Sequence, residues 1–121
     1  MTDRRERAMK PEDIARLVVE RVNAGDADGV AALYEPDAVL DFPLGHQTVG
    51  RDAIRTAYQH LIDQKIPFSA EEPLPTVISG DLALTSTRPA DAAGARVQVA
   101  RRQPDGSWLR VLDRPELVSR S

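Results

Sequence analysis

Hydrophobic positions in the first part of the chain repeat with a helical period. From Pro11 onward, apolar residues recur every three or four positions, which is the spacing of one face of an amphipathic helix. Pro11 suits the first turn of a helix, and Gly25 suits the position just after its end. The residues that define the apolar face are Ile14, Leu17, Val18 and Val22.

Two further helices are expected before residue 66. The segment ADGVAALY, residues 27–34, follows Asp26, a good N-cap residue, and should end before Pro36, because the residue preceding a proline avoids helical geometry. A third helix is expected from Arg51 through RDAIRTAYQHLIDQK. Its apolar residues share one face, and they are Ile54, Ala57, Tyr58, Leu61 and Ile62.

After Pro67 the pattern changes to the alternation that is typical of strands. TVIS and LALTSTR flank Gly80-Asp81, a hairpin turn, and ARVQVARR and WLRVLD flank the turn QPDGS. AVLDF, residues 38–42, is an earlier strand that we expect to join the edge of this sheet, followed by a turn and a brief extended segment. Helices followed by an antiparallel meander predict an α+β fold with helices on one face of one sheet.

The length of 121 residues fits one domain, which we expect over residues 11–116. Residues 1–10 carry six charges and little apolar surface, so a loose, flexible N-terminal arm is expected there. Residues 117–121 are expected to form a C-terminal tail.

Composition excludes several classes of protein. No apolar run approaches the about 20 residues that span a bilayer, and the basic N-terminus lacks the apolar stretch of a secretory signal. The chain has no cysteine, which favours a cytoplasmic location. Residues 88–121 have a net charge of +3 against −6 for residues 1–87, but the arginines are spread along strands. We therefore expect no membrane and no nucleic-acid partner.

Motifs for metal, phosphate and serine chemistry are missing from the sequence. The two histidines are 14 positions apart, without the tight spacing of hydrolytic zinc motifs. There is no Gly-x-Ser-x-Gly and no glycine-rich phosphate loop. We expect neither a metal nor a cofactor.

The segment DFPLGHQTVG contains two candidate catalytic residues. Asp41 lies among apolar neighbours and is either a general base facing a pocket or a strand-end residue that bonds the turn. His46 is either a proton carrier at a pocket lip or an exposed loop histidine. His60, on the third expected helix, should lie at the edge of the buried face or outside it.

The last strand provides a third candidate, Asp113. Strict alternation gives WLRVLD one face with Leu109, Val111 and Asp113, and another with Trp108, Arg110 and Leu112. If the first face is buried, Asp113 points into the fold; otherwise it ends the strand and pairs with an arginine. Trp108 is then either a pocket wall or an anchor in a dimer interface.

Three segments in the same order carry a family resemblance: VNAGDADGVAALYEPDAVLDFP, VGRDAIRTAYQHL and VARRQPDGSWLRVLDRP. Together they resemble the SnoaL-like branch of the nuclear transport factor 2-like superfamily over residues 12–115. The resemblance implies a cone: a strongly bent antiparallel sheet wrapped against three helices, with a pocket in its mouth, and frequently a dimer. Members include ketosteroid isomerase, scytalone dehydratase, limonene epoxide hydrolase and polyketide cyclases, and others bind partners or small molecules without catalysis.

The isomerase residues of the family do not carry over to this chain. The general-base position falls on Phe42, and Asp41, one residue earlier, should point to the opposite face of the strand. The oxyanion tyrosine falls near Val18 and the second oxyanion acid near Ala95. All three positions are apolar, so the resemblance argues against the isomerase mechanism.

We therefore expect a pocket for a small apolar molecule, with no assignable reaction. Cofactor-free acid–base catalysis of the isomerase, cyclase, dehydratase or hydrolase type would use His46, Asp113 and Asp41. The alternative is a non-catalytic ligand-binding or dimeric interaction module, and in both cases a homodimer is expected through the sheet face near Trp108. The expected pocket-lining residues are Val18, Tyr34, Phe42, Leu44, Tyr58, Leu61, Val97, Val99, Leu109 and Val111.

Overall fold

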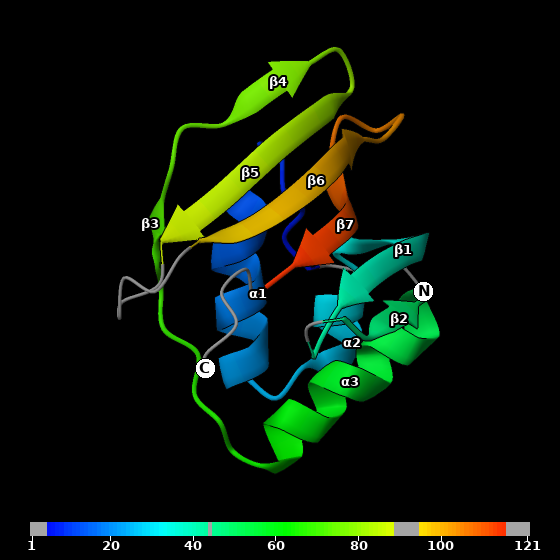
Figure 1. Ribbon diagram of the computed structural model, residues 1–121, viewed down its shortest axis with the longest axis vertical. Helices are drawn as coiled ribbons and strands as arrows, with labels where there is room; N and C mark the ends of the chain where they lie inside the picture. Colours follow the sequence, from blue (N-terminus) through cyan, green and yellow to red (C-terminus); the bar gives the residue numbers. More distant parts are fainter. Residues whose placement is uncertain (1–4, 44, 89–94, 116–121) are drawn as a thin grey trace.

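A computed structural model describes residues 5–43, 45–88 and 95–115 and gives them three helices and seven strands (Figure 1). The helices are α1 (Asp13–Asn23), α2 (Ala27–Ala31) and α3 (Arg51–Asp63). The strands are β1 (Tyr34–Asp41), β2 (Gln47–Val49), β3 (Glu72–Pro73), β4 (Val77–Ser79), β5 (Leu82–Arg88), β6 (Arg96–Arg102) and β7 (Trp108–Arg114). None of these helices is long and apolar enough to cross a membrane.

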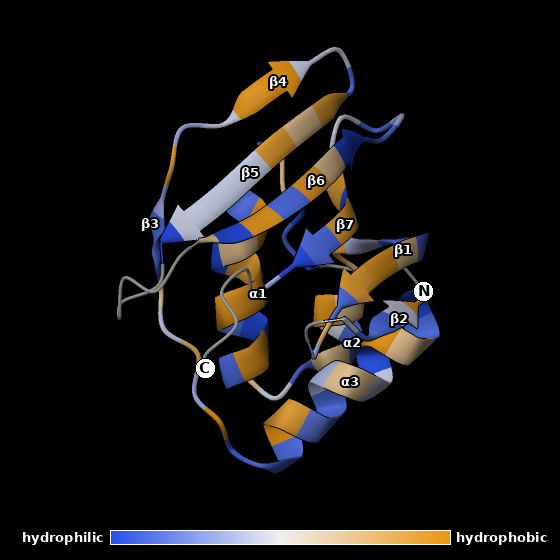
Figure 2. Cartoon of the chain, in the orientation of Figure 1, coloured by the Kyte–Doolittle hydropathy of each residue, from blue (hydrophilic) through white to orange (hydrophobic). Residues whose placement is uncertain are grey.

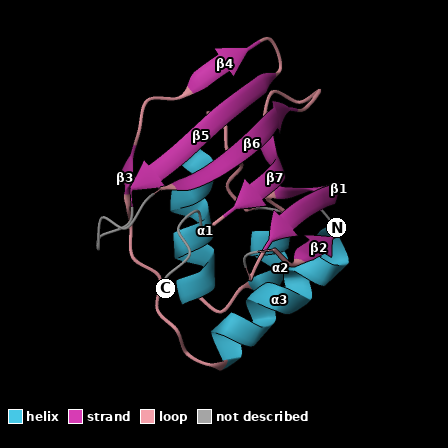
Figure 3. Cartoon of the chain, viewed as in Figure 1, coloured by secondary structure: helices cyan, strands magenta, loops and turns pink. Residues whose placement is uncertain are grey.

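The strands form one curled sheet with the helices gathered on one side of it, which confirms the predicted α+β class (Figure 3). The strand order is β2-β1-β7-β6-β5-β3, and β4 also pairs with β5. The face of the sheet that the helices cover is called the inner face below, and the opposite face is the outer face. The core between the helices and the inner face includes Ile14, Leu17, Val30, Tyr34 and Ile54.

The predicted antiparallel meander is confirmed, and the first strand joins its edge as predicted. β4 to β7 pair antiparallel in sequence order, and Gly80 has the positive φ of 58° that the β4–β5 turn needs. β1 pairs in parallel with β7, the last strand of the meander, and β2 lies outside it. The chain folds back after β1, so the short returning strand β2 extends the sheet by one further strand.

The end of α1 follows the predicted capping pattern. Gly25 takes a φ of 73°, and the N–H groups of Gly25 and Asp26 donate to the carbonyls of Val22 and Arg21, which is a Schellman arrangement. Asp26 then caps α2 by accepting from the N–H of Gly29 at 2.9 Å. These two residues fix the reversal from α1 into α2.

The second helix is shorter than predicted. It ends at Ala31, and Tyr34, expected on the helix, is the first residue of β1. The carbonyl of Leu33 accepts from the N–H of Arg110 at 2.8 Å, so the chain joins the sheet directly after the helix. Pro36 falls where the β1–β7 register is interrupted, and its missing N–H costs no ladder bond there.

A bulge in β7 changes which side chains face the core. Val99 pairs with Leu112 and Ala100 pairs with Arg110, so Val111 is an extra residue without a partner. Alternation is broken at this point, and the predicted faces of β7 are wrong. Buried on the inner side are Trp108, Arg110 and Asp113, whereas Leu109, Val111 and Leu112 lie outside the core.

The outer face carries a row of aliphatic side chains in register across six strands. In sheet order the row is Val49, Val39, Leu112, Val99, Leu84 and Val77. Leu112 is 50% exposed and Val77 is 62% exposed. The hydrophobic colour on β4 and along part of β5 marks one end of this row (Figure 2).

The segment expected to be a loose arm packs against the domain from residue 5 onward. Ala8 is 1% exposed, and its carbonyl accepts from the N–H of Trp108 at 2.8 Å. The buried methyl group of Ala8 and this backbone hydrogen bond hold the segment against the domain. Its many charges had suggested that it would be solvated. The predicted tail, 117–121, lies outside the described residues.

Candidate functional site

Four buried polar side chains meet at the inner face of the sheet. The Tyr34 hydroxyl donates to Asp113 Oδ2 at 2.5 Å, and an Arg110 guanidinium nitrogen donates to the same oxygen at 3.1 Å. The hydroxyl of Tyr58 lies 2.8 Å from that of Tyr34. Three elements, β1, α3 and β7, therefore converge on one carboxylate, and we call these four residues the Asp113 cluster.

Local folding explains how each member reaches the cluster. Tyr58 is one turn after Ile54 on the buried face of α3. Tyr34 is the cross-strand partner of Arg110, so the register between β1 and β7 sets them side by side. The extra residue Val111 then turns Asp113 to the same face as Arg110.

Burial and the neighbouring charge keep both tyrosines protonated. Burial raises the pKa of Tyr34 well above its usual value, and the Asp113 carboxylate raises it further. The same two causes raise the pKa of Tyr58 to about 12. Both hydroxyls are therefore hydrogen-bond donors at neutral pH.

The positive charge of Arg110 is also secure. Burial by itself lowers the pKa of the Arg110 guanidinium, but the Asp113 carboxylate together with Tyr34 and Tyr58 outweighs this effect, and the net pKa of Arg110 is raised. The side chains of Arg110 and Asp113 are 6% and 2% exposed, so they form a buried ion pair. Removing both charges from water is unfavourable, and the pair offsets this cost only when the other donors and acceptors of both side chains are also hydrogen-bonded.

Two atoms of this pair have unused hydrogen-bonding capacity. Asp113 Oδ1 and Arg110 Nε are buried and have no hydrogen-bond partner within the part of the chain that the structure describes. An unsatisfied buried acceptor on a charged group is costly, so natural folds rarely keep one without a functional reason. Asp113 Oδ1 is therefore the carboxylate oxygen of the cluster that is left to accept a further hydrogen bond.

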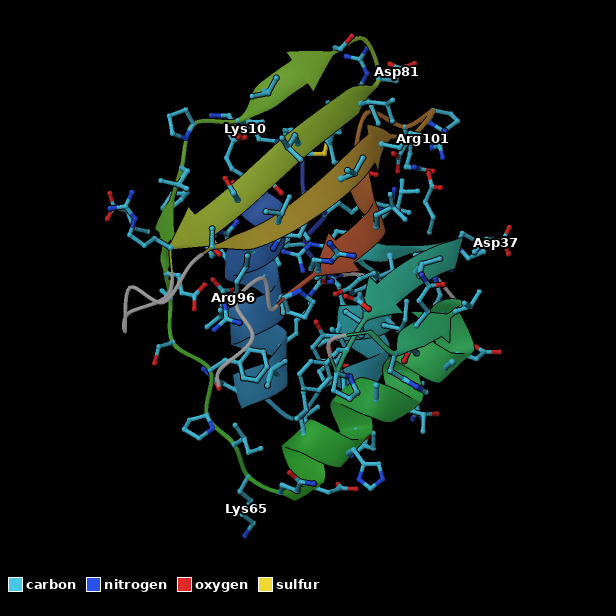
Figure 4. All side chains as sticks on the ribbon, in the orientation of Figure 1. Lys10, Asp37, Lys65, Asp81, Arg96 and Arg101 are labelled. Atoms are coloured by element: carbon cyan, nitrogen blue, oxygen red, sulfur yellow. The ribbon has the colours of Figure 1, made fainter. Side chains whose placement is uncertain are left out.

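Polar side chains continue along the inner face beside Asp113. Gln98 on β6 is the cross-strand partner of Asp113, and its Oε1 accepts from the Thr85 hydroxyl at 2.8 Å. Further along, Arg96 donates to both oxygens of Glu71 at 2.9 Å and to the carbonyl of Pro115 at 2.7 Å. Arg96 lies at the start of β6, far from Arg101 and Asp81 at the other end of the sheet (Figure 4).

The three predicted catalytic residues do not come together. Asp113 is buried in the cluster, but His46 is exposed in the β1–β2 turn. Asp41 accepts from the N–H of Gly45 at 3.1 Å and from Arg114 at 3.1 Å. It is therefore a strand-end residue that bonds the turn, which is the second of the two interpretations given above. His60 is exposed on α3.

The predicted pocket-lining residues divide into two groups. Val18, Tyr34 and Tyr58 are buried in the core, and Phe42 and Leu61 are half-buried against it. Val97 and Val99 lie on the outer face, because β6 turns Gln98 and Ala100 inward, and Val111 is the bulge residue of β7. Leu44 lies outside the described residues.

Leu109 lies between the inward-facing Trp108 and Arg110 and lines a cavity of about 400 Å³ at the other end of β7. This cavity lies between the N-terminal segment and the β6–β7 turn. Its apolar lining includes Ala8, Leu33 and Trp108. The rim arginines already hold ion pairs, Arg5 with Asp26 and Arg7 with Asp105.

Sequence reasoning missed the roles of Arg110, Gln98 and Thr85. Strict alternation placed Arg110 on the face opposite Asp113, and Gln98 and Thr85 were assigned no role. An arginine between Leu109 and Val111 was the available signal, because a charge inside an apolar strand is rare unless it is paired. No three His, Asp or Glu side chains gather closely enough to hold a metal ion within residues 5–43, 45–88 and 95–115.

The sequence was compared with protein families and with curated proteins. The family model for the SnoaL-like domain matches residues 15–113. None of the curated proteins matches the sequence.

Solved structures share the fold at low identity. A ketosteroid isomerase-like protein from Erwinia carotovora atroseptica SCRI1043 is 22% identical with a TM-score of 0.69, over 90% of this chain and 94% of the other. An NTF2-like protein with a cystatin-like fold from Novosphingobium aromaticivorans is 19% identical with a TM-score of 0.62, over 90% and 80%. An NTF2-like protein of unknown function from Pseudomonas putida KT2440 is 20% identical with a TM-score of 0.61, over 85% and 80%.

Proposed function

Because the chain belongs to the SnoaL-like domain family, we propose that it holds a small, largely apolar molecule against the inner face of the sheet, with Asp113 as the acid–base group. The observation that carries the proposal is the environment of Asp113: a buried carboxylate with one oxygen bonded to Tyr34 and Arg110 and the other unpartnered among the described residues. The absence of cysteine favours a cytoplasmic location for this activity.

The proposed division of roles follows the hydrogen bonds. Arg110 and Tyr34 hold Asp113 through Oδ2, which leaves Oδ1 to take a proton from the bound molecule or return one. Tyr58 supports Tyr34 and does not touch Asp113 Oδ2 itself. Asp41 and His46 take no part, because one bonds the turn and the other is exposed.

Such a site serves reactions that consist of proton transfer without a cofactor. Isomerase, cyclase, dehydratase and hydrolase types all need one poised carboxylate and an apolar enclosure. Buried Val18 and half-buried Phe42 and Leu61 belong to the same apolar core as Tyr34 and Tyr58. The reaction within this class stays unassigned.

Turnover by matched variants tests the proposal. The wild-type protein is incubated with small cyclic ketones, alcohols and epoxides, and products are followed by NMR spectroscopy. We expect Asp113→Asn, which keeps the side-chain shape, to abolish any conversion, whereas Asp41→Asn keeps it. Conversion that survives Asp113→Asn, or its absence for the wild type with every compound, contradicts the proposal.

A second function, assembly into a homodimer, is supported by the outer-face row. Six aliphatic side chains in register form one apolar strip, and a two-fold axis would let the strip cover a copy of itself. Trp108, the anchor suggested by the sequence, is 5% exposed in the core and cannot fill that role. Leu112 and Val99 at the centre of the row replace it.

The assembly proposal is tested at the centre of the row. Sedimentation at micromolar concentration should give a dimer for the wild type and a monomer for Leu112→Lys. Val49→Lys, at the end of the row, should weaken the dimer less. A monomeric wild type would refute the proposal.

A further inference from the structure

The acid–base group of the proposed site is closed off from solvent. Asp113 is 4% exposed, and Oδ1, the oxygen left to accept a hydrogen bond, is itself buried. Its cross-strand partner Gln98 is also 4% exposed. A molecule from solution reaches Oδ1 only after some part of the fold moves aside, so this arrangement is a closed state of the site.

Residues 67–71 join α3 to β3 and bridge the helices and the sheet beside this site (Figure 1). Phe68 and Glu71 are the two half-buried side chains of this segment, and the other three residues are exposed. The Phe68 ring packs against the ring of Tyr58, with centroids 6.4 Å apart, and Tyr58 belongs to the Asp113 cluster. The segment therefore contacts the site directly.

A first latch holds the segment to the end of α1. The side-chain amide of Asn23 donates to the carbonyl of Phe68 at 2.8 Å, and its oxygen accepts from the N–H of Phe68 at 2.9 Å. Residues 67–71 belong to no helix or strand, so this clamp takes the place of a backbone ladder. Both bonds are exposed, and water competes for their donors and acceptors when they break.

A second latch holds the segment to the sheet. Both oxygens of Glu71 accept from Arg96 Nε at 2.9 Å, and one of them accepts from the Thr87 hydroxyl at 2.8 Å. Arg96 and Thr87 are cross-strand partners in β6 and β5. Gln98, the partner of Asp113, is two positions further along β6 and on the same face as Arg96. This latch therefore lies immediately beside the buried carboxylate.

The chain is fixed on both sides of the segment. Lys65 ends α3 with a φ of 56°, and its N–H donates to the carbonyl of Ile62 at 2.9 Å. On the other side, the N–H of Leu74 donates to the carbonyl of Ser86 in β5 at 2.9 Å. Lys65 lies well away from Arg96, so the segment crosses a wide part of the molecule between these anchors (Figure 4). Breaking the two latches releases only the stretch between them.

We propose that residues 67–71 are a lid over the inner face, held closed by the Asn23 clamp on Phe68 and by the ion pair of Glu71 with Arg96, and that a ligand enters when this lid opens. The inference rests on the proposed function of the Asp113 cluster. It adds the route of access to that site and the two latches that regulate it.

The other boundaries of the site are harder to open. β5, β6 and β7 are each paired on both sides. α1 and α3 bury core residues such as Leu17 and Ile54, which would be exposed if either helix moved. Phe68 is the one half-buried apolar side chain that the lid withdraws. Segments with few buried contacts are the ones that open locally while the rest of a fold stays intact, and active-site lids are drawn from them.

Introduced thiols measure the opening, because the chain has no cysteine of its own. Thr85→Cys places a thiol on the inner face next to Gln98, and Ala8→Cys places one at a buried position under the N-terminal segment. The small neutral reagent methyl methanethiosulfonate reacts with each thiol when an opening exposes it, and mass spectrometry follows the rate. Urea unfolding of each variant shows that it is folded. Gln98→Cys, opposite Asp113, provides a second inner-face reporter.

We expect variants of the latches to speed labelling of the inner-face thiol. In the Thr85→Cys protein, Asn23→Ala should raise the rate about 10-fold, because two hydrogen bonds of the closed lid are lost and the rate follows the open fraction. Glu71→Gln, which removes the charge of the second latch, should raise it about 3-fold. The two changes together should give about 30-fold, since the latches contact different residues.

A matched control separates the lid from ion pairs in general. Asp81→Asn breaks the exposed pair of Asp81 with Arg102 at the β4–β5 turn and should leave labelling of the Thr85→Cys thiol unchanged. The Ala8→Cys thiol should be labelled at the same rate whether or not the latches are intact, because the lid does not cover it.

The results distinguish failure of the lid from failure of the proposed function. If the double latch variant labels the Thr85→Cys thiol no faster, or speeds both thiols equally through global unfolding, the lid is wrong while the turnover test of Asp113→Asn is untouched. If only the inner-face thiol is labelled faster but conversion survives Asp113→Asn, the lid stands and the role of Asp113 is wrong.

Discussion

The hydroxyl of Tyr34 donates to Asp113 Oδ2 across 2.5 Å, which joins the first residue of β1 to the penultimate residue of β7. The two residues are 79 positions apart in the sequence. The bond forms only when β1 has docked parallel to β7 and the bulge in β7 is in place. It therefore reports on the complete assembly of the sheet.

Removal of the hydroxyl of Tyr34 should destabilise the fold more than removal of that of Tyr58. Tyr34→Phe deletes a donor to a buried charge, and we expect a loss of about 1–3 kcal/mol in the free energy of unfolding. Tyr58→Phe leaves the bond from Tyr34 to Asp113 intact and should cost about 0.5–1.5 kcal/mol. Urea unfolding measures both, and equal losses would show that Tyr34 has no privileged role.

Both tyrosines of the chain should resist ionisation in the folded state. They are the only two tyrosines in the sequence, so tyrosinate absorbance reports on the cluster alone. Tyr58 has a pKa of about 12 when folded against an ordinary value of 10.0. The raised pKa contributes stability that is complete below pH 10 and is lost as the pH rises toward 12.

An alkaline titration checks this expectation. Tyrosinate absorbance should stay near zero to pH 11 in buffer, whereas in denaturing urea it should rise around pH 10, the ordinary tyrosine pKa. In Tyr58→Phe the free energy of unfolding should fall less steeply with pH above pH 10, because one of the two raised tyrosine pKa values is removed. Ordinary titration of either tyrosine in the folded protein would mean that the cluster is open to solvent.

Breaking the buried ion pair from one side should cost more than replacing both partners. Asp113→Leu leaves the Arg110 charge buried and unpaired, and we expect a loss of about 3–5 kcal/mol. The double variant Arg110→Met/Asp113→Leu should recover most of that loss, because two apolar side chains can fill the space. Urea unfolding of the wild type, both single variants and the double variant gives the coupling free energy between Arg110 and Asp113. If the losses of the two single variants simply add in the double variant, the two side chains do not form a tight pair.

Replacement of Phe42 tests the position on which the family resemblance sets the general base. Phe42 is half-buried against the core, so Phe42→Asp should lower the free energy of unfolding by about 2–4 kcal/mol. The matched change at the neighbouring position, Asp41→Asn, loses an ion pair with the exposed Arg114 and should cost less than 1 kcal/mol, roughly the value of a surface pair. A small effect of Phe42→Asp would show that this side chain is not part of the apolar wall.

Local signals predicted the helices and the meander. Helical periodicity marked α1 and α3, and Gly25 with Asp26 marked the reversal between α1 and α2. Alternation and the Gly80 turn marked β4 to β7. These features depend on neighbours within a few residues, which is the range that a sequence pattern records.

Features set by distant contacts were not predictable. The parallel pairing of β1 with β7 joins segments more than 70 residues apart, and nothing local in AVLDF indicates it. The bulge at Val111 leaves no mark in composition, because valine is an ordinary strand residue. Of the candidate site, the sequence predicted Asp113 as a catalytic residue and Tyr34 and Tyr58 as pocket-lining residues. The contacts of Asp113 with Tyr34 and Arg110 depend on these two features.

The extra residue in β7 also decides how changes of length in this strand act on the site. Deletion of Val111 would make Arg110, Leu112 and Asp113 consecutive partners of Ala100, Val99 and Gln98, so each would keep its face and Asp113 would stay inside. Regular pairing with Val111 retained would instead carry Asp113 to the face opposite Arg110, because the two residues are three positions apart. Residues of this strand should therefore be matched between homologues by their partners in β6, since a count along the chain does not fix the face.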